Sequence, residues 1–177
     1  MNMKLSQMMI ALFMTIALLI GLEIVTATIL PLFGWHEYRL IFHVLFIIFL
    51  AIRLDTPLVP WLVLILQVIH SAFSVEGWAI GTFAGIIILL SANYLKEILH
   101  LTTAFMTMIT VQLFQVIWFV TVTCIICLKI SDFSKFGMVL WSFVPGSFVL
   151  SFISPLLFWS LERIWRESSE STRGVGI

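Results

Sequence analysis

Five polar side chains lie within or beside the apolar stretches of this sequence and are its first candidates for chemistry: Glu23, His43, Gln67, His70 and Glu76. Gln67 and His70 are three residues apart, so a helix would place them on the same face. An ionisable group in the hydrocarbon layer is costly unless it is paired or reached by water. Glu23 therefore has to be protonated or has to find a partner, for instance a histidine.

Two interpretations of these side chains stay open. In the functional one they line a ligand pocket or a proton relay, with Gln67, His70 and Glu76 at the mouth of a helical hairpin. In the structural one they form hydrogen bonds between helices, which replace the missing hydrophobic drive between helices in lipid. The structural interpretation also covers two polar faces further along the chain, namely Thr103, Thr107 and Thr110 on one and Gln112 and Gln115 on the other.

Established catalytic and cofactor patterns are not evident. No glycine-rich phosphate loop is present, and no serine–histidine dyad stands out. His43 and His70 could in principle meet, but two isolated histidines are weak evidence for haem. We therefore predict a protein that is not an enzyme, with no catalytic, cofactor-binding or metal-binding residues.

Three glycines follow this polar region at intervals of four residues: Gly77, Gly81 and Gly85. On a helix they form one stripe without side chains, which favours close packing against another helix. The stripe is predicted to be a helix-packing or partner face, and the neighbouring helix could belong to this chain or to another protein.

The composition places these residues in a membrane protein. Of the 177 residues 62% are hydrophobic and only 10% are charged, and the mean hydropathy is +1.17. A soluble domain is about half apolar and a quarter charged. We predict an all-α, polytopic bundle of about six transmembrane helices in residues 1–167, and a polar, disordered tail in residues 168–177. The expected spans are Met8–Leu30, Leu40–Ile52, Leu58–Phe73, Trp78–Leu95, Leu101–Leu128 and Phe136–Leu161.

The second and third spans are shorter than the roughly 20 residues that cross a bilayer. They would have to borrow flanking residues, tilt, or lie where the bilayer is thin. The first span is longer than the apolar core of a signal peptide, so we expect it to be retained as a helix.

The basic residues predict the orientation, because cytoplasmic loops are enriched in lysine and arginine. Six helices would place both ends of the chain on one side, and the two sides would carry six and three basic residues. The six are Lys4, Arg53, Lys96, Arg163, Arg166 and Arg173, and the three are Arg39, Lys129 and Lys135. Both termini are therefore predicted to be cytoplasmic, with the basic end formed by Arg163 and Arg166 at the anionic leaflet.

Two stretches resemble the rod shape-determining membrane protein MreD family. They are "SVEG" at Ser74–Gly77, followed by "WAIGTFAG", and the closing helix "SPLLFWSLERIWR" at Ser154–Arg166. The family's aspartate near the end of the third helix is replaced here, where Ile69 and His70 stand. The resemblance implies a six-helix protein of the bacterial inner membrane with a non-enzymatic part in cell shape and peptidoglycan synthesis. Its partners would be membrane lipid, an MreC-like single-span shape protein and the cell-wall synthases, with a possible homodimer and no nucleic acid.

The same layout is similar to the substrate-binding subunits of energy-coupling-factor vitamin transporters. In that alternative Glu23, Gln67, His70 and Glu76 would line an outward-opening pocket. The first helix lacks the A-x-x-x-A spacing with which such subunits dock on their partner, because Ala11, Ala17 and Ala27 are not four residues apart. The scaffold is therefore the preferred interpretation.

Overall fold

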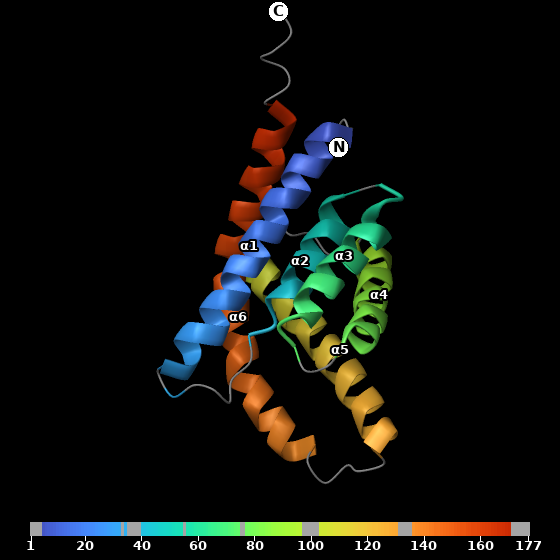
Figure 1. Cartoon of the computed structure of the whole chain (residues 1–177), viewed down its shortest axis with the longest axis vertical. Coiled ribbons are helices and arrows are strands. Elements are labelled where there is room, and N and C mark those ends of the chain that lie inside the picture. The colour runs from blue at the N-terminus through green and yellow to red at the C-terminus, as the bar shows by residue number, and fades with distance from the viewer. Residues whose placement is uncertain are drawn as a thin grey trace, which may run out of the picture.

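The described part of the protein is a bundle of six α-helices (Figure 1). The computed structural model describes residues 5–32, 34, 40–54, 56–74, 77–96, 103–130 and 136–170, and these contain no β-strand. α1, α4, α5 and α6 are long and apolar enough to cross a membrane, whereas α2 and α3 are shorter apolar helices. The predicted all-α, polytopic fold is confirmed. The helices are α1 (Leu5–Leu32), α2 (Phe42–Arg53), α3 (Val59–Ser71), α4 (Trp78–Leu95), α5 (Ala104–Ile130) and α6 (Phe136–Glu170).

The short helix α2 lies in the centre of the bundle. It contacts each of the other five helices, and ten of its twelve residues, Phe42 to Ala51, are buried. A helix that is hydrophobic on all sides is buried in this way, because it has no polar face to turn to water. Twelve residues make only about 18 Å of helix, against about 30 Å of hydrocarbon. Because α2 is enclosed by the other helices and does not face lipid, the length of α2 need not match the thickness of the bilayer.

The other helices surround α2. Contacts join α1 to α6, α6 to α5, α5 to α4, and α4 to α3. The start of α1 and the end of α6 lie at the same end of the bundle, and α6 changes direction along its length (Figure 1). Pro145 and Pro155 lie inside α6, and a proline bends a helix because it removes one backbone hydrogen bond. α6 continues to Glu170, three residues into the predicted tail, whose last seven residues lie outside the described ones.

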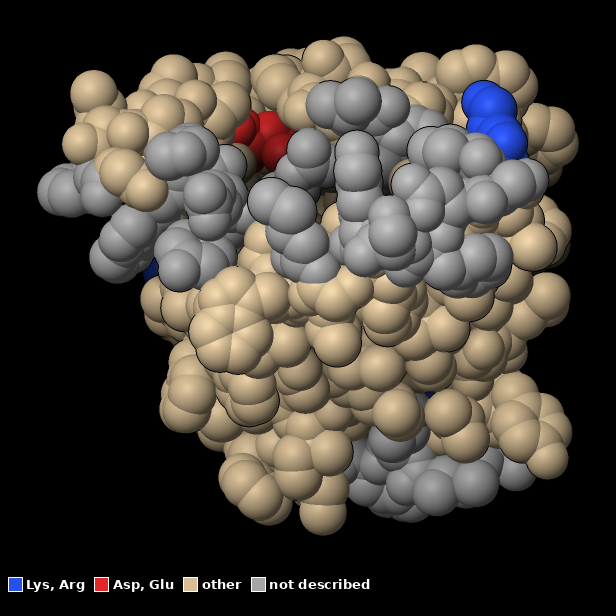
Figure 2. Space-filling view, turned by 90° about the horizontal axis from the view of Figure 1, so that it is seen from below, with Lys and Arg blue, Asp and Glu red and all other residues tan. Residues whose placement is uncertain are grey.

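The outer surface is apolar. Phe13 of α1, Phe105 of α5 and Phe152 of α6 are among many large hydrophobic side chains that are exposed. Figure 2 views the bundle from the end opposite the termini and shows only small charged patches among the described residues. This surface is suited to lipid and to the helices of other membrane proteins.

Candidate functional site

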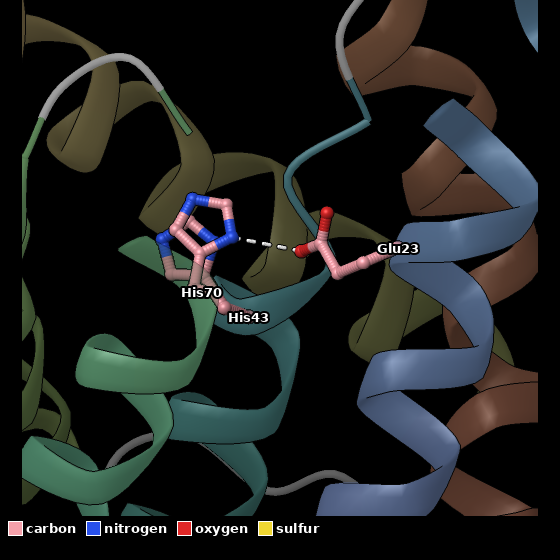
Figure 3. A group of neighbouring side chains, drawn as sticks. All are labelled: Glu23, His43 and His70. Carbon is pink, nitrogen blue, oxygen red and sulfur yellow. Dashed lines mark hydrogen bonds and ion pairs between the residues drawn. The ribbon is translucent and has the colours of Figure 1, made fainter. Parts of the chain in front are cut away.

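The most concentrated group of ionisable side chains in the described part of the chain consists of Glu23, His43 and His70 (Figure 3). Glu23 comes from α1, His43 from the first turn of α2, and His70 from the last turn of α3. All three are buried, and His43 has no exposed surface. The structure thus brings together three of the five predicted polar candidates.

The positions of the helices explain this meeting. α2 and α3 are consecutive helices in contact and run in opposite directions (Figure 1). His43 and His70 stand at nearly equal numbers of residues from the turn that joins these helices, so they lie at the same level. α1 packs beside both helices and supplies Glu23. This symmetry about the turn is the signal in the sequence that could have paired the two histidines.

The carboxylate has a histidine as its partner. Nδ1 of His70 lies 2.8 Å from Oε1 of Glu23, within hydrogen-bonding distance. A buried Glu23 needs either a proton or such a partner, and His70 is that partner. In this buried place the hydrogen bond is stronger than it would be in water, because the local dielectric constant is low.

His43 has a different environment. Its ring stacks on that of His70, with ring centroids 3.6 Å apart and an angle of 28° between the planes. The Trp118 ring packs against it in an edge-to-face arrangement, with ring centroids 5.1 Å apart and an angle of 70° between the planes. Neither ring nitrogen of His43 has a hydrogen-bond partner in the described part of the chain, and neither does Nε1 of Trp118. A buried polar atom without a hydrogen-bond partner costs about 1–3 kcal/mol. The unpaired nitrogens of His43 therefore need a physical explanation.

The three side chains suit two kinds of chemistry. The Glu23–His70 pair can hold and pass a proton. The cluster can also ligate a cation, because one ligand atom from each residue lies within 4.8 Å of the other two. The expectation of no metal ligands treated the histidines as isolated, and their contact in the structure removes that reason.

Gln67 lies apart from these contacts, between α3 and the glycines of α4. A Cβ atom added at Gly81 would lie 2.9 Å from Oε1 of Gln67, and one added at Gly85 would lie 2.8 Å from its Nε2. These two glycines therefore pack against the chain's own α3. Gly77 precedes α4 at its N-cap, with a φ of 79° and open space around it. The prediction of a single helical stripe through all three glycines is therefore wrong at Gly77, because the helix begins after it.

The glutamines of α5 join that helix to α6. Nε2 of Gln115 donates to Oγ of Ser151 at 3.1 Å, and Oγ of Ser151 donates to Oε1 of Gln112 at 2.7 Å. Nε2 of Gln112 also donates to Oγ of Ser147 at 3.1 Å. The structural interpretation therefore holds for the two glutamines. Of the threonines, Thr107 and Thr110 are buried.

The remaining candidates lie elsewhere. Glu76 is outside the described residues. Arg163 and Arg166 belong to the last turns of α6, at the end of the bundle where α1 begins and α6 ends (Figure 1). The guanidinium carbon of Arg163 lies 5.9 Å from the centroid of the Trp159 ring, a cation–π distance.

Comparison with known proteins adds no relative. No protein-family model, no curated protein and no solved structure matches the chain. Its function is therefore inferred from its residues and their geometry.

Proposed function

We propose that this protein is a non-enzymatic scaffold in the bacterial inner membrane that takes part in cell elongation by binding an MreC-like single-span shape protein and, through it, the cell-wall synthases. The observation that carries the proposal is the filled centre of the bundle. α2 occupies the position that a ligand chamber would need, and its residues Phe42 to Ala51 are buried against the surrounding helices. The α5–α6 contact is likewise fixed by hydrogen bonds within the chain. A bundle whose centre is filled by its own side chains leaves its outer surface for binding partners.

A stripe of aromatic side chains on α6 is the surface we assign to the partner helix. Trp141, Phe148, Phe152 and Trp159 are all exposed, and their spacing of 7, 4 and 7 residues keeps them on one line of a helix with 3.6 residues per turn. The two tryptophans are 18 residues apart, about 27 Å of helix, which is close to the hydrocarbon thickness. Tryptophan is common at both membrane interfaces. The two phenylalanines then lie at the depth where a single-span helix would pack.

Affinity purification from the native membrane in mild detergent tests this function. The expected co-purifying proteins are a single-span periplasmic shape protein and wall synthases. The double variant Phe148→Leu with Phe152→Leu keeps the surface apolar but removes the rings, and it should lower the recovery of the shape protein at least about tenfold. Phe13→Leu, at an exposed position on α1, is the matched control and should leave recovery unchanged.

The substrate-binding subunit of a vitamin transporter is the second candidate, and one observation favours it. Within the Glu23–His43–His70 cluster both nitrogens of His43 have no hydrogen-bond partner among the described residues, as expected of a ligand site. Recovery of a paired ATPase module with a larger membrane coupling protein, and of no shape protein, would contradict the scaffold and favour this alternative.

A further inference from the structure

We propose that Glu23, His43 and His70 form a binding site for one divalent transition-metal ion, with Zn²⁺ and Co²⁺ as its probes. This inference goes beyond the scaffold function and does not depend on it. It starts from the position of the three side chains on three different helices, which meet only in the folded bundle (Figure 3).

The donor set is appropriate for such an ion. Two imidazoles and one carboxylate are the ligands of zinc sites that keep an open position, and of iron sites with two histidines and a carboxylate. Magnesium and calcium prefer oxygen ligands, so the two histidines select against them. Because three helices each supply one ligand, a bound ion would tie α1, α2 and α3 together.

The distances permit coordination after small side-chain movements. The three ligand atoms lie within 4.8 Å of one another, while the ligands of a tetrahedral zinc ion, with bonds of about 2.0–2.2 Å, are roughly 3.3–3.5 Å apart. The 2.8 Å hydrogen bond between His70 and Glu23 would open slightly. The stacked rings of His43 and His70 would tilt so that their nitrogen edges converge on the ion.

The bonding of His43 is what a purely structural role leaves unexplained. The Glu23–His70 hydrogen bond pairs Nδ1 of His70 with Oε1 of Glu23, but both nitrogens of the completely buried His43 are left without a partner among the described residues. Phenylalanine would fill the same place at no such cost. A metal ion gives one of these nitrogens a strong bond.

The test uses the purified full-length protein in detergent, stripped of metal with a chelator and then titrated with Co²⁺ and with Zn²⁺. The expected result is about one ion per chain, with the visible absorption of Co²⁺ in a nitrogen and oxygen environment. His43→Phe keeps the ring stack and the volume but removes both nitrogens. It should weaken binding at least about 100-fold, since even changes outside the ligands cost 10- to 100-fold. Glu23→Gln, which is nearly isosteric, should do the same.

Trp118→Phe is the matched control, because it removes the neighbouring unpartnered N–H group and no ligand. It should bind one ion as the parent protein does. His43→Phe is expected to be at least as resistant to thermal unfolding as the metal-free parent, so a loss of binding there is not a loss of the fold. The proposal is overturned if the parent binds no ion, or if His43→Phe and Glu23→Gln both bind as tightly as the parent.

Discussion

Replacing Gly85 with alanine tests the close contact between α3 and α4. The added Cβ would lie 2.8 Å from Nε2, 3.3 Å from Cγ and 3.4 Å from Cδ of Gln67. Gln67 is only 1% exposed, so its side chain has to rotate within the packed interior or the two helices have to move apart. Overpacking of this kind lowers the free energy of unfolding by about 1–3 kcal/mol. The higher helix propensity of alanine offsets up to about 1 kcal/mol of this loss. The expected net loss of stability is about 1–2 kcal/mol.

Reversible unfolding in mixed micelles with a denaturing detergent measures this change. Gly21→Ala is the matched control, because a Cβ there has no atom within 4 Å, and it should leave the free energy of unfolding unchanged or slightly higher. Gly85→Ala should become harmless in a Gln67→Ala background, where the space is free. The two substitutions should therefore show a coupling of about 1–3 kcal/mol.

Two results would refute this reasoning. If Gly85→Ala cost the same in both backgrounds, the contact that matters would not be the one with Gln67. If Gly85→Ala left stability unchanged but prevented recovery of the partner proteins, the glycine face would be directed towards a partner rather than towards α3.

Two further predictions concern hydrogen bonds between the long helices. Ser151→Ala removes a hydroxyl that bonds to both glutamines of α5, and it should lower the free energy of unfolding by about 1–2 kcal/mol. The control is Ser160→Ala, because the hydroxyl of Ser160 bonds within its own helix. Equal effects of the two substitutions would contradict an interhelical role for Ser151. Trp165→Phe removes the 3.1 Å bond from Nε1 to Oγ1 of Thr15 that joins α6 to α1. It should cost about 1 kcal/mol or more, whereas Trp159→Phe at the exposed surface should change thermal stability little; the reverse order would show that the buried bond is not stabilising.

Much of the fold could be predicted because lipid restricts the choices. A chain in a bilayer has to satisfy its backbone hydrogen bonds internally, so long apolar runs become helices. The six expected spans therefore agree with the six helices to within a few residues at most ends. The largest difference in bounds is at the end of α6, which was expected at Leu161 and lies at Glu170. The glycine stripe was wrong at Gly77, which precedes α4 with a positive φ. A regular spacing of four residues does not reveal where a helix begins.

The candidate site could be predicted only in part. Burial of Glu23 requires a protonated carboxyl or a partner, and this could be stated from its place in an apolar run. The packing of α1, α2 and α3 decides which histidine pairs with Glu23. It also leaves His43 with nitrogens that have no partner in the described ranges. The same holds for Gln67, whose amide proved to fill the space between two glycines rather than to join the histidines.

The sequence by itself determined that this protein is a helical membrane bundle, because its composition leaves too little charge to solvate a surface and its apolar runs have the length of helices. It also determined which side chains would be costly in that setting. Only the tertiary structure decided that the short second helix is the centre of the bundle, and that a carboxylate and two imidazoles from three helices meet beside it. The physical reason is that the hydrophobic effect is non-directional, so it favours burial of an apolar run without choosing its neighbours. The packing of one helix on another then fixes which side chains come within a few ångströms of one another.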